Sequence, residues 1–341
     1  MADYITNKEQ LTSLADAIRG KAGLAASTSI TYTADFISYI STIASGQYSL
    51  EDIITKSKFT SLSLSLSSIP SYAFYGFSAL KTATFPNCSG MIHDAAFQMC
   101  SALSSISFPT CTHISASAFE SCYSLTSASF PACSYIGQYA FRSCSNLLSV
   151  SFPSCTYIGG NAFTMCSKLR EANFSVCSSI GSDAFWSCYA LSRISFPLCS
   201  SWGQYPFEYC SALQSVSFSL ISIITYQAFF HCSNLTDVNI PNAVIVSSQA
   251  FNYCTSLSAV SFTACSKVDQ SAFANCFSLK SLYLMSTSVV SLVNVNAFTS
   301  SPMSLSSYLG TFGSIFVRSS LLATYKTAAN WSIYSARLVG K

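Results

Sequence analysis

The chain has 341 residues, only 9% of them charged, and a formal net charge of +3. By length alone it could hold roughly two or three domains. Because Lys and Arg are sparse and form no cluster, the chain offers little attraction for a phosphate backbone, and nucleic acid is not an expected partner. Polar residues interrupt every apolar run well before the ~18 residues that a membrane helix requires, so no membrane span is predicted.

The first 47 residues differ from the rest of the chain. Residues 6–19 predict a helix, with Thr6 and Glu9 as a capping-box pair and Gly20 at the position of a C-terminal stop. A second apolar-periodic stretch follows, so residues 1–47 are predicted to be a helical attachment or capping segment. The start of the chain lacks the basic and apolar regions of a secretory signal, so we expect the protein to act where it is made or to leave the cell by a non-classical route.

From Ala73 onward the pair Ala-Phe, once Pro-Phe, recurs with a period of about 22 residues, which lies in the range of solenoid repeats. A single unit of this length cannot bury its own apolar side, so successive units must stack and share one core. The recurrence therefore predicts a solenoid of about ten to eleven repeats over residues 59–300. The column phenylalanines are Phe74, Phe97, Phe119, Phe141, Phe163, Phe185, Phe207, Phe229, Phe251, Phe273 and Phe298.

One unit, residues 118–139, illustrates the expected local structure. Its segment Leu125-x-x-Ala128-x-Phe130 alternates apolar residues with Ser, which is the period of a half-buried strand, and Pro131 then ends the strand. The remainder of the unit is too short for a long helix and predicts turns. Residues 301–341 are predicted to be a C-terminal cap, with a last strand at 314–318 and a helix over 319–334.

The sixteen cysteines fall into two columns of the repeat, half a repeat apart within a unit, as Cys122 and Cys133 are. Phe77 occupies the slot of the first column in the opening unit, and Ile221 and Ala243 occupy the slot of the second. A column of disulfides or metal ligands would lose its purpose at those positions, whereas a buried apolar column would not. The cysteines are therefore predicted to be buried, reduced thiols, as suits a reducing cytosol, with stacked disulfides within a column or bound metal as the alternatives.

The pattern L-x-x-[IVA]-x-F-P-x-C-x-x-I-G-x-x-A-F-x-x-C resembles the BspA-type leucine-rich repeat of bacterial surface and phage-associated proteins, over roughly residues 59–318. This resemblance implies a right-handed solenoid with a parallel sheet, used as a binding scaffold and not for chemistry. Residues 2–6, 11–19 and 30–37 are similar to N-terminal segments of tail-associated proteins of phages and prophages of gut Firmicutes. That similarity implies attachment to virion tail or baseplate proteins through residues 1–47.

Candidate chemistry is weak. The three histidines lie in different units and form no triad, HExxH or P-loop pattern, so no enzyme and no cofactor is predicted. His231 precedes Cys232, but adjacent residues on a turn usually point apart. Glu171, Arg193 and Asp237 fall on the predicted sheet face and could form a surface ion pair of little energetic consequence.

The slots between Ala-Phe and the next Leu vary while their surroundings stay constant. Aromatic residues at fixed geometry, with small polar neighbours, are typical of recognition surfaces, because rings give a large contact area at low entropic cost. The alternative is a variable surface without a ligand. The predicted ligand-binding residues are Tyr123, Trp186, Tyr189, Tyr209, Phe230, His231, Tyr253 and Phe277.

These features favour a non-enzymatic recognition protein that binds a host surface protein or carbohydrate. The first hypothesis is a phage or prophage tail-associated receptor-binding protein, located in the virion, or in the cytoplasm before assembly. The alternative is a BspA-like surface adhesion protein or interaction scaffold, located at the bacterial cell surface.

Overall fold

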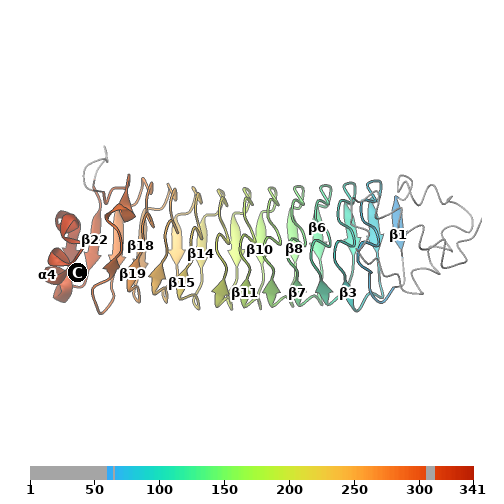
Figure 1. The fold of residues 1–341 in the computed structure, drawn as a ribbon, viewed down its shortest axis with the longest axis horizontal. Helices are drawn as coiled ribbons and strands as arrows, with labels where there is room; N and C mark the ends of the chain where they lie inside the picture. Colours follow the sequence, from blue (N-terminus) through green and yellow to red (C-terminus); the bar gives the residue numbers. More distant parts are fainter. Residues whose placement is uncertain (1–59, 64–65, 305–311) are drawn as a thin grey trace, which may run out of the picture.

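The computed structural model describes residues 60–63, 66–304 and 312–341, which form one elongated stack of coils (Figure 1). The predicted helical segment 1–47 lies outside the described residues. The stack is a parallel β-solenoid of about twelve turns, slightly more than the ten to eleven repeats predicted from the Ala-Phe pairs. This parallel solenoid, with its 22-residue spacing and few helices, confirms the predicted solenoid architecture.

Each coil contributes one strand to a first row, whose members run parallel and side by side along the stack. Hydrogen bonding divides this row into β1-β2-β4, β6 to β12, β14-β16 and β18-β20-β22-β23. The strands are β1 (Ser61–Ser63), β2 (Thr82–Thr84), β4 (Ser105–Ser107), β6 (Ser127–Ser129), β8 (Ser149–Ser151), β10 (Glu171–Asn173), β12 (Arg193–Ser195), β14 (Ser215–Ser217), β16 (Asp237–Asn239), β18 (Ala259–Phe262), β20 (Ser281–Leu284), β22 (Ser314–Val317) and β23 (Leu338–Gly340).

A second row of two-residue strands forms another wall of the solenoid. In this row β3 to β13 are hydrogen-bonded in one group, and β15 to β21 form another. The strands are β3 (Met91–Ile92), β5 (His113–Ile114), β7 (Tyr135–Ile136), β9 (Tyr157–Ile158), β11 (Ser179–Ile180), β13 (Ser201–Trp202), β15 (Ile223–Ile224), β17 (Ile245–Val246), β19 (Lys267–Val268) and β21 (Ser291–Leu292).

The Ala-Phe pairs lie on tight turns that close each coil, as the shortness of this segment predicted. The residues two before and two after the phenylalanine have positive φ, for example Ser117 at 54° and Ser121 at 61°. Non-glycine residues rarely adopt this region. Here it lets alternate N–H groups bond the next coil: the Phe119 N–H donates to the Ala140 carbonyl at 2.8 Å, and the Ser121 N–H to the Arg142 carbonyl at 2.8 Å.

The interior consists of stacked columns. Phe119 and Phe141 have centroids 5.2 Å apart, Phe130 and Phe152 have centroids 5.3 Å apart, and Phe130 meets Phe141 edge-on. These offset and edge-to-face contacts are the favoured arrangements of aromatic pairs. The repeating phenylalanines therefore pack as two interleaved ladders along the stack.

All sixteen cysteines are free and buried, at the slots that the repeat gave them. In the first column the thiol donates to a carbonyl of the preceding coil, as Cys122 Sγ does to Phe97 O at 3.2 Å. In the second it donates to a carbonyl two residues later, as Cys133 Sγ does to Tyr135 O at 3.2 Å. Burial raises the pKa of the Cys133 thiol to about 12, so the neutral thiol is the stable form.

The C-terminal segment covers the last coil, but the helix predicted over 319–334 is broken into η2 (Ser319–Leu321), α4 (Leu322–Thr327) and η3 (Ser332–Arg337). A further strand, β23, follows them and was not predicted. Trp331 and Tyr334 pack against Phe298, and the Trp331 indole N–H donates to the Val290 carbonyl at 2.6 Å. Without the C-terminal segment, the last coil would expose its column of rings and the carbonyls at its edge. Several short segments cover both, and this explains why they replace one long helix.

Candidate recognition site

The predicted ligand-binding residues all lie on the turn face, which we define as the outward residues from two before to four after each column phenylalanine. They come from three different slots of the repeat. Trp186 and Phe230 follow their phenylalanine by one residue. Tyr209, His231 and Tyr253 follow theirs by two, and Tyr123, Tyr189 and Phe277 follow theirs by four.

Five of these side chains meet in one continuous cluster, which we call the aromatic ridge: Trp186, Tyr209, Phe230, His231 and Tyr253. The rings of Trp186 and Tyr209 meet edge-on at 6.3 Å, and Tyr209 meets Phe230 edge-on at 5.6 Å. Tyr209 stacks on His231 at 5.0 Å, and His231 stacks on Tyr253 at 4.2 Å. The cluster spans four successive coils, and each ring is half-buried.

The other three predicted residues do not extend the ridge in the same way. Tyr123 and Tyr189 are 46% and 51% exposed, and no ring contact joins either to the ridge within the described part of the chain. Phe277 lies one coil beyond Tyr253 and is 46% exposed. Their slot comes after the inward cysteine, on the next turn of the coil, so the repeat spacing alone did not place them beside the other rings.

An acidic side chain outside the predicted set of ligand-binding residues lies inside the ridge. Glu208 occupies the same slot as Trp186 in the preceding coil and Phe230 in the next, and it is only 8% exposed. This burial, reinforced by the nearby negative charge of Asp183, raises the pKa of Glu208 to about 7, although a hydrogen bond with Trp186 opposes the shift. Burial also raises the pKa of Asp183. The sequence signal for this position was an acidic residue with an aromatic residue one repeat before it and another one repeat after it.

The pair His231 and Cys232 is not arranged for catalysis. Burial lowers the pKa of His231, whose ring stacks in the ridge, and Cys232 points inward to donate to the Phe207 carbonyl at 3.2 Å. Burial also raises the pKa of Cys232, which disfavours the reactive thiolate. Among the described residues, no group of three or more His, Cys, Asp or Glu side chains could hold a metal ion.

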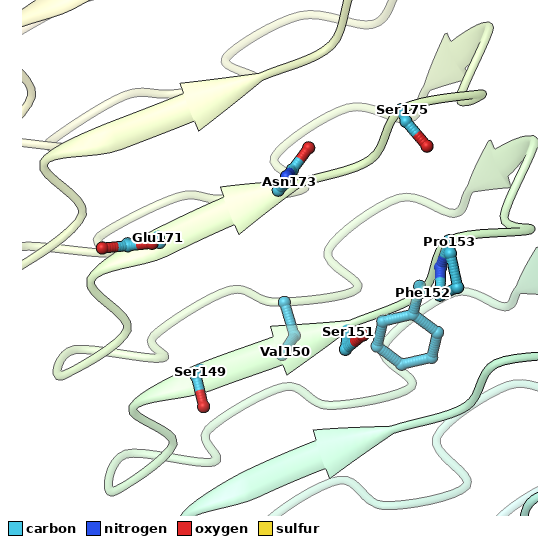
Figure 2. Close-up of a pocket in the computed structure, with 8 residues that line it drawn as sticks. All are labelled: Ser149, Val150, Ser151, Phe152, Pro153, Glu171, Asn173 and Ser175. Atoms are coloured by element: carbon cyan, nitrogen blue, oxygen red, sulfur yellow. The ribbon is translucent and has the colours of Figure 1, made fainter.

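The sheet face, which we define as the outward residues of β4 to β16, has two adjoining depressions that the sequence analysis also missed. One, of about 290 Å³, lies between β8 and β10 and is lined by Ser149, Ser151, Glu171 and Asn173 among others (Figure 2). The second, of about 320 Å³, shares Glu171 and Asn173 and extends to Arg193. The expected ion pair forms between Glu171 and Arg193, both exposed. Ala172, a smaller residue than Val150 and Ile194 in the neighbouring strands, lines the second depression.

No helix in residues 60–63, 66–304 and 312–341 is long and apolar enough to cross a membrane. Among solved structures, the chain is similar to a leucine rich cell surface protein from Faecalibacterium prausnitzii, with 24% identity over 67% of this chain and 79% of that one and a TM-score of 0.36. It is also similar to a leucine-rich repeat protein from T. pallidum, with 29% identity over 46% and 78% of the two chains and a TM-score of 0.44.

A leucine-rich repeat protein from Bacteroides ovatus is 19% identical over 80% of this chain and 87% of that one, with a TM-score of 0.39. No curated protein sequence matches the chain. The sequence model of the BspA type leucine rich repeat region matches residues 67–192 and 178–305, which together cover most of the solenoid. The chain therefore belongs to the BspA-type leucine-rich repeat family.

Proposed function

We propose that this protein is a non-enzymatic adhesion protein or interaction scaffold of the BspA type, acting at the bacterial cell surface, and that the aromatic ridge is its recognition surface. The observation that carries the proposal is the unbroken run of ring contacts from Trp186 to Tyr253. The rings are half-buried, and the parts of them that stay exposed form a contiguous apolar surface of the kind that typically marks a site of interaction.

Two further features support a role in recognition. The rings hold one another in fixed orientations across four coils, so little side-chain entropy is lost when a partner docks. Trp and Tyr are also the residues most enriched among those that dominate binding energy. The regular stack below the ridge supplies a rigid platform for them.

The tail-associated hypothesis depends on residues 1–47, which lie outside the described residues. The family match supports the alternative of an adhesion protein or interaction scaffold, because it covers the solenoid and leaves residues 1–47 out. The attachment role of residues 1–47 stays a prediction: deleting them should leave a folded solenoid that no longer incorporates into phage particles, as judged by size-exclusion chromatography and particle assembly.

The recognition role is tested by removing the two rings that begin the ridge. Trp186→Ala combined with Tyr209→Ala should abolish attachment to target cells, because both rings contribute contact area, while the thermal midpoint changes by only a few degrees. The matched control is Tyr135→Ala combined with Tyr157→Ala, two stacked rings of the second strand row. That control should bind normally. Normal binding by the ridge variant would rule out the ridge as the recognition surface.

A further inference from the structure

Glu208 is enclosed by aromatic side chains within the ridge. Trp186 and Phe230 flank it in the neighbouring coils, and Tyr209, the next residue along the chain, touches both of their rings. The face of an aromatic ring carries partial negative charge and attracts cations. A carboxylate placed among such rings adds a full negative charge to the same small volume.

Nothing within the described chain neutralises this charge. Asp183 lies in the preceding coil close enough to raise the pKa of Glu208, and neither carboxylate takes part in an ion pair among the described residues. Glu120 occupies the same slot four coils earlier and contrasts with Glu208. It accepts a hydrogen bond from Gln98 at 2.7 Å and pairs with Arg142 at 3.5 Å.

The other titratable groups that interact with Glu208 do not supply a cation. Burial is the main reason that the pKa of Tyr205 in the same coil is raised, and both carboxylates add to the shift. Cys232 in the next coil has a raised pKa, with the Glu208 charge as one cause. Burial lowers the pKa of His231 in the ridge, so this ring is neutral near pH 7.

We propose that the ridge binds a protein partner through a lysine or arginine side chain, whose cationic group lies against the Trp186 and Phe230 rings with Glu208 and Asp183 as counter-ions. This inference rests on the proposed function and specifies its partner. An ammonium or guanidinium group offers several N–H donors and a full positive charge, which matches two carboxylates and the faces of the neighbouring rings. A neutral glycan would leave the carboxylates without compensation.

The proposal predicts that binding is linked to protons. A cation stabilises the ionised form of Glu208, so affinity should rise as the pH is raised through about 7 and fall as Glu208 becomes protonated. The probe is a capped eight-residue oligolysine peptide, and the signal is the emission of Trp186. The other two tryptophans, Trp202 and Trp331, are buried at 9% and 1% exposure and respond less.

With the full chain, the peptide should bind about tenfold more tightly at pH 8 than at pH 5.5, the size expected for a charge-assisted interaction. Glu208→Gln should remove most of this pH dependence and weaken binding at pH 8 to the low-pH level. Glu120→Gln is the matched control, because Glu120 holds the same slot but already has a cation, and it should bind like the parent.

The outcomes separate this inference from the function on which it rests. If the oligolysine peptide does not bind, or if Glu208→Gln binds it as tightly as the parent, cation recognition is wrong even when the Trp186 and Tyr209 variant still loses cell attachment. If a neutral oligosaccharide competes for cell attachment and oligolysine does not, the partner is a glycan. If the ridge variant attaches normally, the recognition role itself fails.

Discussion

The sheet face and the turn face follow the same repeat, yet they differ in how much their outward residues vary from coil to coil. On the sheet face most outward positions are serine, as in β4, β6, β8 and β14. On the turn face the outward slot after the column phenylalanine passes through Thr164, Trp186, Glu208 and Phe230 in four successive coils. The backbone is equally regular on both faces, because backbone hydrogen bonds join each coil to the next on both.

This difference separates the positions that stabilise the fold from the positions that are available for recognition. Inward columns are nearly invariant on both faces, since each ring or thiol must fit the same layer of its neighbours. Most outward positions face no such requirement. The greater variation on the turn face is what a selected interaction surface would produce, and it supports the proposed recognition role.

The largest expected effect is on the shared interior. Phe163→Ala in a central coil should lower the free energy of unfolding by ~3–5 kcal/mol, because a buried ring stacked on Phe141 and Phe185 is lost. Ser149→Ala on the sheet face should change it by less than about 0.5 kcal/mol. Chemical denaturation followed by circular dichroism measures both. Equal losses would mean that outward residues also stabilise the stack.

A smaller effect is expected at Glu208, a buried acid of the turn face. The carboxyl of Glu208 has a pKa of about 7 in the folded chain and an ordinary value of 4.5. The folded state therefore holds its proton more tightly, so the contribution of this group is complete below pH 4.5, is lost between about pH 4.5 and 7, and is absent above.

Glu208→Gln should remove that dependence and be more stable than the parent at pH 8 by on the order of 2 kcal/mol, after allowance for relaxation around the charge. Thermal unfolding at pH 5 and pH 8 measures the difference between the two proteins. Asp183→Asn should shift stability in the same direction by less. A parent and a Glu208→Gln variant with parallel pH profiles would show that Glu208 ionises freely in the folded chain.

The interior could be predicted from the sequence because it obeys a single rule. Residues one repeat apart stack, so Phe119, Phe141 and Phe163 had to form one column, and replacement of cysteine by Ile221 and Ala243 showed that its column is apolar. The broken C-terminal segment follows no period, so its short helices and β23 could not be found this way.

The site was predictable only in part, because it depends on contacts between different slots. His231 and Tyr253 share a slot and stack, as the repeat requires. Trp186 and Tyr209 meet from different slots, and this depends on the positive φ of Tyr209, 60°, which the spacing does not reveal. The same turn geometry carries Tyr189 away from the ridge and buries Glu208 within it.

The smallest expected effect concerns the ion pair of the sheet face. Glu171 and Arg193 are directly opposite each other in β10 and β12, and their side chains are 54% and 75% exposed. Exposed pairs are screened by water and lose side-chain entropy when they form, so a double-mutant cycle with Glu171→Gln and Arg193→Gln should give a coupling of about 0.2–1 kcal/mol. The coupling should shrink further in 1 M salt. A coupling well above that range would mean that the hollows beside Glu171 hold charge in a more shielded environment, and the sheet face would then have to be considered a second place where outward residues matter.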